Sequence, residues 1–143
     1  MFFGPPSNPL DDHDAISGFM NEIGEKIILG GTTCSIFEHH LKSKTRIELK
    51  TSGCELLPYG FLGNIFVTEG TLTLKKLNDV FFSEYNIDDA VKLLKDKIAK
   101  HDKIKIYRGR AINPVNGIDK NAVFTEFVKY LRASGKSPEI VNF

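Results

Sequence analysis

The sequence is short of cysteine, of long apolar runs and of net charge, and each shortage excludes a class of protein. Its two cysteines, Cys34 and Cys54, lie far apart with no C-x-x-C spacing, which indicates reduced thiols rather than a disulfide scaffold. No apolar run approaches the roughly 20 residues of a membrane-spanning helix. The 19 basic and 18 acidic residues almost cancel, whereas a nucleic-acid-binding domain usually has a basic excess. We therefore expect a cytoplasmic protein that binds neither nucleic acid nor membrane.

Both standard nucleotide-binding fingerprints are also missing, since the sequence has neither G-x-x-x-x-G-K-S/T nor G-x-G-x-x-G. Asp11-Asp12-His13-Asp14 carries metal-ligand side chains, but at a helix start these side chains splay around the helix axis. His39 and His40 are neighbours near a helix end, and adjacent residues do not share a helix face. The sequence thus predicts no metal site and indicates no particular cofactor.

The chain has 143 residues, of which 41% are hydrophobic and 26% charged, values that are typical of one soluble globular domain. We expect residues 1–143 to form a single domain. Residues 1–3 have the composition of a strand, and a natural protein rarely begins on a strand with so little before it. We therefore expect the chain to be the C-terminal part of a longer protein.

Apolar runs alternate with segments of helical periodicity along the chain. We expect strands at residues 1–3, 27–29, 45–50, 65–67, 103–107 and 139–143. We expect helices at residues 8–24, 33–42, 71–83, 87–100 and 119–133. This alternation predicts a three-layer, Rossmann-like α/β fold, with a mostly parallel sheet of about five or six strands and helices on both faces. The two helices within residues 71–100 form a helical hairpin inserted between two strands, and the Gly- and Pro-containing residues 51–63 form a loop.

Small, hydroxyl-bearing and charged residues follow four of the expected strands. In an open parallel sheet the carboxyl ends of the strands share one edge, and ligands bind beyond that edge. The four turns are Gly4-Pro5-Pro6, Gly30-Gly31-Thr32-Thr33, Thr68-Glu69-Gly70-Thr71 and Arg108-Gly109-Arg110 with Asn113. We expect these segments to meet at one ligand site.

The turn Gly30-Gly31-Thr32-Thr33 is the centre of the expected site. Two glycines let the backbone turn sharply and bring main-chain N–H groups close to a ligand. The helix start that follows offers unpaired N–H donors and the positive end of a helix dipole. These features favour a small anionic ligand that bears a phosphate or a carboxylate.

Each side chain of this site also has a purely structural interpretation. Thr32 and Thr33 either donate hydroxyls to the anion or cap the helix. Arg108 and Arg110 either clamp the anion or lie in solvent. Glu69 either binds a metal or a ribose hydroxyl, or lies beside a helix N-terminus that favours an acid.

Four motifs occur in an order and at a spacing that match a known family: Gly4-Pro5-Pro6, the segment from Lys26 to Thr33, the segment from Val67 to Leu74, and Gly109-Arg110-Ala111-Ile112-Asn113. Through them the chain resembles the region that follows the catalytic domain in stage II sporulation protein E family serine phosphatases of anaerobic bacteria. The resemblance covers nearly the whole chain, and its most specific parts are Gly-Gly-Thr-Thr and Thr-Glu-Gly.

The resemblance implies a companion domain to a phosphatase rather than the catalyst. The family's activity belongs to an upstream metal-dependent domain of the protein phosphatase 2C type, whose aspartate-rich motifs have no counterpart here. After Asn113-Pro114 the family tends to continue with Ala-His-Gln, whereas this chain has Val115-Asn116-Gly117. Any role of the family's histidine is therefore not carried over.

Three functional hypotheses remain open from the sequence. The leading one is a non-catalytic regulatory domain that reports a small anionic ligand to the phosphatase catalytic domain of the same or a related chain. The second is a small enzyme that uses Glu69 or Cys34, because a helix dipole lowers the pKa of a thiol in the first turn, although a buried structural cysteine fits the same pattern. The third is an interaction module for homodimerisation or for docking on the phosphatase domain, which eleven phenylalanines permit.

Overall fold

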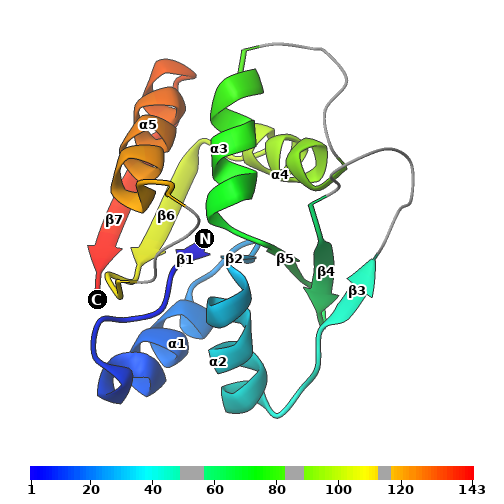
Figure 1. Cartoon of the computed structure of the whole chain (residues 1–143), viewed down its shortest axis with the longest axis vertical. Helices are drawn as coiled ribbons and strands as arrows, with labels where there is room; N and C mark the ends of the chain where they lie inside the picture. The colour runs from blue at the N-terminus through cyan, green and yellow to red at the C-terminus, as the bar shows by residue number, and fades with distance from the viewer. Residues whose placement is uncertain (49–56, 83–88, 113–116) are drawn as a thin grey trace.

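The computed structural model describes residues 1–48, 57–82, 89–112 and 117–143 (Figure 1). Its strands are β1 (Phe2–Phe3), β2 (Ile27–Leu29), β3 (Arg46–Glu48), β4 (Tyr59–Leu62), β5 (Ile65–Thr68), β6 (Lys103–Arg108) and β7 (Ser137–Asn142). Its helices are α1 (Asp12–Asn21), which follows the 3-10 turn η1 (Pro9–Asp11), α2 (Gly31–Leu41), α3 (Thr71–Val80), α4 (Asp89–Ala99) and α5 (Lys120–Ala133). The seven described strands form one sheet in the order β3-β4-β5-β2-β1-β6-β7.

Five neighbouring strands of this sheet are parallel, as the sequence predicts. The chain runs outward from β1 through β2 to β5, and after α3 and α4 it crosses to β6 on the other side of β1 and then to β7. Among the described strands, β3 and β4 alone run antiparallel to their neighbours, at the β5 side of the sheet. The predicted three-layer, Rossmann-like α/β fold is confirmed, with α3 and α4 as the expected helical hairpin between two parallel strands.

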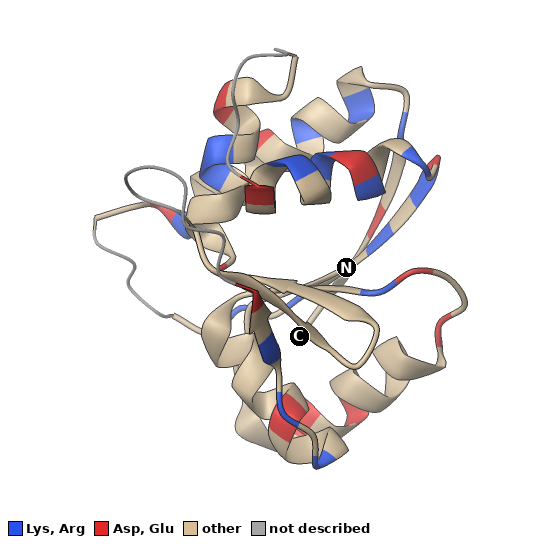
Figure 2. Cartoon of the chain, turned by 90° about the vertical axis from the view of Figure 1, so that its right-hand side faces the viewer, with Lys and Arg blue, Asp and Glu red and all other residues tan. Residues whose placement is uncertain are grey.

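The parallel strands are apolar on both faces, so the sheet lies between two cores. Phe3 and Leu29 belong to the core under α3, α4 and α5, whereas Phe2 and Ile28 belong to the core against α1 and α2. Figure 2 shows the two helix layers on opposite sides of the strands, with many of the charged residues on the helices. Because successive residues of a strand point to opposite faces, the two residues of β1 join both cores.

An aromatic cluster surrounds Phe2 at the centre of the sheet. The ring of Phe2 meets those of Phe19 on α1 and Phe37 on α2 edge to face, at centroid distances of 5.4 and 5.0 Å. It also stacks on Tyr107 of β6, 5.9 Å away. These geometries are the favoured ones for aromatic pairs. The cluster therefore fixes α1 and α2 against the middle strands.

The antiparallel strand β4 was not predicted, because residues 51–63 have the composition of a loop. Gly60 lies inside β4, paired with Ile47 of β3. A Cβ atom at Gly60 would collide with the backbone carbonyl oxygen of Arg46. The glycine therefore marks a close approach of two strands rather than a loop. The part of this interval at 49–56 lies outside the described residues.

The first and last helices show where periodicity succeeds and where it fails. Asn8 accepts a hydrogen bond from the N–H of Leu10 at 3.2 Å, as expected of a helix cap, and it opens the turn η1 before α1. Ile23 lies at helical spacing from Ile16 and Phe19, which predicts a buried side chain, but it is fully exposed because α1 already ends at Asn21. In α5 the apolar residues that recur at helical spacing are all buried: Val123, Phe124, Phe127, Val128 and Leu131.

Replacing Phe37 by Ala should destabilise the fold by about 3–5 kcal/mol, because the substitution leaves a cavity beside Phe2 and Phe19. Urea denaturation followed by circular dichroism measures this change. The control is Leu10→Ala at a side chain that is 85% exposed, where we expect a change within about 0.5 kcal/mol. Equal effects of the two substitutions would contradict the assignment of the core.

Candidate functional site

A cavity of about 360 Å³ lies at the carboxyl edge of the parallel strands. The turns after β1, β2 and β5 all contribute to its wall, together with the start of α5. The predicted site residues that line it are Gly30, Gly31, Thr32, Thr33, Glu69 and Thr71, and they are joined by Gly4 and Pro5. Three of the four turns that the sequence analysis expects at one site therefore line one cavity.

The N-terminus of α2 opens into this cavity without a cap. The N-cap residue is Gly30, which has no side chain to accept a hydrogen bond from the first turn. Within the described part of the chain, the N–H groups of Gly31, Thr32 and Thr33 have no hydrogen-bond partner. Gly31 and Thr32 are exposed. This helix end therefore combines free donors with the positive end of the helix dipole.

The neighbouring helices α3 and α5 are capped by their own acidic side chains. The carboxylate of Glu69 accepts a hydrogen bond from the N–H of Leu72 at 2.8 Å. Asp119 accepts hydrogen bonds from the N–H groups of Asn121 and Ala122 at 2.8 and 3.1 Å. Glu69 therefore makes the contact expected of an acid beside a helix N-terminus, the structural one of its two interpretations. Of these three helix starts, that of α2 is the one with no side chain bonded to its first N–H groups among the described residues.

Lys120 supplies the cationic side chain of the cavity, and the sequence analysis missed it. It is the first residue of α5, and its Nζ atom lies beside Gly4. The ammonium group lies 5.2 Å from the centroid of the Phe3 ring, which is within the range of a cation–π contact. No acidic side chain of the described residues pairs with it.

Partial burial and charge repulsion both act on Lys120. Desolvation lowers the pKa of its ammonium group, and the positive charge of Arg108 lowers it further. A bound anion would oppose both effects, because a negative charge nearby favours the protonated form. Lys120 is therefore a half-buried cation without an acidic counter-charge among the described residues.

Close backbone contact holds the turns after β2 and β5 together. Gly30 donates its N–H to the carbonyl oxygen of Thr68 at 2.9 Å. Gly70 has a φ of 111°, and a Cβ atom there would lie 2.8 Å from both the Cα and the N atom of Gly30. Only glycine fits such an approach, because no side chain can occupy that space. Thr68 and Gly70 do not line the cavity themselves, and their contacts with Gly30 position its wall.

Two buried threonine hydroxyls near this edge lack a hydrogen-bond partner in the described structure, those of Thr33 and Thr68. Thr33 lines the cavity and is 1% exposed, whereas Thr68 lies at the end of β5 and does not line it. A buried hydroxyl without a partner costs free energy. The hydroxyl of Thr33 is thus a further polar group at the open start of α2.

The fourth predicted turn lies beside the cavity and not in its wall. Arg108 and Arg110 line a separate hollow of about 220 Å³ around the start of α5, which shares Lys120 with the first cavity. Backbone hydrogen bonds from Gly109 to the carbonyl oxygen of Phe3 and from Ala111 to that of Pro5 extend the pairing of β1 and β6 beyond both strands. These bonds hold together the segments that follow β1 and β6. Asn113 lies outside the described residues.

Cys34 is a buried cysteine, as one of the two interpretations left open by the sequence describes it. Its side chain is buried, and its Sγ atom lies 2.9 Å from Oγ1 of Thr45. Burial raises the pKa of the thiol, so the thiolate that a nucleophile needs is disfavoured. Neither Cys34 nor Glu69 has a hydrogen-bonded histidine in the part of the chain that the structure describes.

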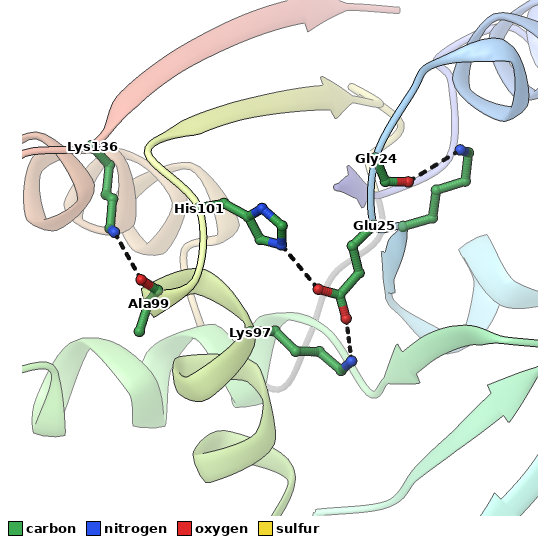
Figure 3. Close-up of polar contacts among 7 residues, drawn as sticks. Gly24, Glu25, Lys97, Ala99, His101 and Lys136 are labelled. Carbon is green, nitrogen blue, oxygen red and sulfur yellow. Dashed lines mark hydrogen bonds and ion pairs between the residues drawn. The ribbon is translucent and has the colours of Figure 1, made fainter.

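A second cavity, of about 540 Å³, lies at the opposite, amino edge of the strands. Figure 3 shows the carboxylate of Glu25 there, between Lys97 on α4 and His101 after that helix. Burial alone would raise the pKa of Glu25, but the hydrogen bonds from Lys97 and His101 outweigh it and lower the pKa. This group of charges connects the segment before β2 to α4.

Glu22 forms a similar contact with β6 on the wall of the same cavity. It accepts hydrogen bonds from Nζ of Lys105 and, at 2.6 Å, from the hydroxyl of Tyr107. The bond from Lys105 and then that from Tyr107 hold the pKa of Glu22 below its usual value. Since the carboxylates of Glu22 and Glu25 are already paired, these contacts stabilise the fold.

Fold and site together define a Rossmann-like α/β protein with a candidate small-ligand site at the carboxyl edge of its sheet. Comparisons with models of protein families, with curated proteins and with solved structures found no match. None of the described helices combines the length and the apolar character needed to cross a bilayer.

Gly70→Ala should destabilise the fold by about 1–3 kcal/mol more than Gly24→Ala. Both glycines have a similar positive φ, 111° and 116°, which L side chains rarely adopt, so both substitutions strain the backbone. The added methyl group collides with Gly30 only at Gly70, because nothing lies within 4 Å of a Cβ atom at Gly24. Urea midpoints measure both changes, and equal losses would disprove the close contact.

Glu22→Gln should destabilise the protein near neutral pH and have a smaller effect in acid. Because the pKa of Glu22 is lowered in the folded state, its carboxylate stabilises the fold above the unfolded pKa of about 4.3, and this contribution is lost as the pH falls through the folded pKa. Urea midpoints of both proteins, measured from neutral pH to about pH 3, test this. Lys105→Met should show the same trend, and a pH-independent difference would contradict the pairing.

Proposed function

We propose that the chain is a non-catalytic ligand-binding domain that takes a small anion, a phosphate- or carboxylate-bearing molecule, at the turn between β2 and α2. One observation carries the proposal: the uncapped start of α2 shares a cavity with Lys120, whose ammonium group has no acidic partner among the described residues. Free N–H donors and an unpaired cation on one cavity are the elements of an anion site.

Two electrostatic contributions act together at this site. A helix N-terminus stabilises a neighbouring anion by about 0.3–1 kcal/mol, and by up to about 2 kcal/mol where solvent is partly excluded. A hydrogen bond between two charged groups adds about 1.5–3 kcal/mol. The second is strengthened because Lys120 is half-buried. The phosphate or carboxylate would lie between the N–H groups of Gly31 and Thr32 and the ammonium of Lys120.

The apolar residues of the cavity wall indicate the chemical character of the rest of the ligand. Phe3, Pro5, Leu29 and Pro58 add apolar surface to the cavity. A volume of about 360 Å³ suits a small organic molecule rather than a bare ion. We therefore propose a compact ligand with one anionic group and a largely apolar body.

A regulatory role extends the proposal, in keeping with the resemblance to the region after the catalytic domain of stage II sporulation protein E family phosphatases. In this view the domain reports ligand binding to a phosphatase catalytic domain of the same or a related chain. A ligand has this effect only if it binds one conformation of the pair more tightly than the other.

The alternative of a small enzyme has weaker support from the site. Chemistry needs a nucleophile and a base within hydrogen-bond reach. The thiol of Cys34 contacts a threonine hydroxyl, and the carboxylate of Glu69 caps α3. The open donors of α2 favour binding over reaction.

Inorganic phosphate, phenyl phosphate, butyrate, a sugar phosphate and adenosine monophosphate form the test panel, with isothermal titration calorimetry as the measurement. Phenyl phosphate and butyrate have the single anionic group and the compact apolar body proposed above. We expect saturable binding of at least one compound. Lys120→Met should weaken that binding by about tenfold or more, because it removes the cation and keeps the aliphatic stem. Lys100→Met, at an exposed lysine after α4, is the control and should leave the affinity unchanged.

Gly31→Val provides an independent variant of the same site. A Cβ atom at Gly31 meets no atom within 4 Å, so the variant should fold, but its side chain would obstruct the free N–H groups. The proposal fails if no compound of the panel binds, or if both site variants bind as well as the wild type.

A further inference from the structure

A third hollow, of about 360 Å³, lies between α5 and β7 and shares no lining residue with the anion cavity. Three cationic side chains line it, those of Arg108, Lys129 and Arg132. Apolar side chains form its floor: Phe124, Val128 and Ile140. None of the acidic side chains in the described ranges lines this hollow or pairs with its three cations. The hollow is thus a cationic groove with an apolar floor.

Arg108 is held in place inside this groove. Its guanidinium group lies 4.4 Å from the ring centroid of Phe124 and donates a hydrogen bond to Oδ1 of Asn121 at 2.6 Å. These contacts orient the planar group and leave several of its five N–H donors unused. A carboxylate that binds there meets a cation whose conformational entropy is already reduced.

The groove runs along the outer edge of β7, which pairs with β6 on its other side. The N–H groups of Ser137 and Phe143 donate toward the β6 side, to the carbonyl oxygens of Asp102 and Arg108. Since alternate residues of a parallel strand bond to opposite sides, the N–H and C=O groups of Ile140 and Asn142 point outward. In the described structure no strand pairs with this edge, so these groups offer a template for a further strand.

We propose that an acidic, extended segment of a partner protein adds to β7 as an eighth strand and places its side chains in the groove. Main-chain hydrogen bonds to Ile140 and Asn142 would supply affinity, and the groove would supply selectivity. Charge complementarity identifies the occupant, because three unpaired cations at an apolar floor favour a segment that carries both acidic and apolar residues.

The register of β6 and β7 predicts the order of residues in that segment. Arg108 lies level with Asn142, and Ile106 lies level with Ile140. Since α5 leads back to β7, Arg132 near its C-terminal end lies toward the start of β7. A strand on this edge would therefore show an acidic residue, then an apolar one, then an acidic one on its α5 face. Because alternate residues share a face, the pattern is acidic-x-apolar-x-acidic.

A second copy of this chain is a poorer occupant of the same edge. Two β7 edges side by side would bring the cations of both grooves together, and like charges at an interface disfavour association. The acidic residue of β7 itself, Glu139, does not line the groove, and its carboxylate lies 3.9 Å from Nζ of Lys105. Self-association through β7 is therefore the competing outcome of the test.

Fluorescence anisotropy with the labelled peptide Ser-Thr-Glu-Thr-Val-Thr-Glu-Thr-Ser tests the proposal on the full chain. We expect saturable binding, weakened about tenfold or more when Gln replaces both Glu residues of the peptide. The double variant Lys129→Glu with Arg132→Glu should weaken binding similarly. Its control, Lys92→Glu with Lys100→Glu, makes the same charge change at exposed positions on and after α4 and should have less than about a twofold effect.

A second pair of variants tests the strand pairing itself. Asn142→Pro removes one outward N–H group and keeps the bonds to β6, so it should weaken peptide binding, whereas Asn142→Ala should not. Lys120→Met should leave peptide binding unchanged, which separates this surface from the proposed anion site. Circular dichroism melts confirm that each variant is folded.

Three results would overturn the proposal. One is the absence of saturable peptide binding up to about 1 mM. Another is equal weakening by the two charge-reversal variants, which would indicate attraction without a defined site. The last is a concentration-dependent dimer in sedimentation analysis that Asn142→Pro abolishes, which would assign the edge to a second copy of the chain.

Discussion

The whole fold depends on a strand of only two residues. Phe2 and Phe3 form β1, which lies between β2 and β6 at the centre of the sheet and pairs with both. The ring of Phe2 is enclosed by α1 and α2, and the ring of Phe3 stacks on Phe124 of α5, 5.6 Å away. The two helix layers therefore meet through adjacent side chains. Burial of two such rings contributes about 3–6 kcal/mol to folding, a large share of the stability of a small domain.

This central position also creates the candidate site. Because β1 is so short, the chain leaves the sheet at Gly4 and Pro5, and these residues become a wall of the anion cavity. Lys120, at the start of α5, then reaches over Phe3 toward Gly4. The ring of Phe3 thus packs in the core and also contacts the ammonium group of Lys120. The site combines backbone from three turns with one side chain from a distant helix.

Much of the fold could be predicted because its signals are local. Short apolar runs identify β2 and β5, alternating polar and apolar residues identify β6, and the apolar residues at helical spacing in α5 match its buried face. The strand β4 was missed because Gly60 is required by contact with the carbonyl oxygen of Arg46, a neighbour that only the folded sheet reveals. Local propensity cannot report a contact of that kind.

The site shows the same limit more clearly. The turn of Gly30 and Gly31 was identified from a local pattern, and it does line a cavity. Lys120 has no such pattern, because its position matters only once α5 packs beside β1 at the other end of the sequence. Arg108 was predicted to follow its strand, but it is the last residue of β6, and its side chain packs on Phe124 instead of turning toward the cavity. The direction of a side chain at a strand end depends on the helix that packs over it. The spacing of residues in the sequence does not predict which helix that is.

The contact between Gly30 and Gly70 gives the two halves of the molecule a rigid joint. Gly30 leads into α2 on one face of the sheet, and Gly70 leads into α3 on the other. With no side chain between them, neither helix can slide along its axis without pushing the backbone that starts its counterpart. The starts of α2 and α3, on opposite faces of the sheet, are therefore joined by main-chain contact alone, without an intervening side chain.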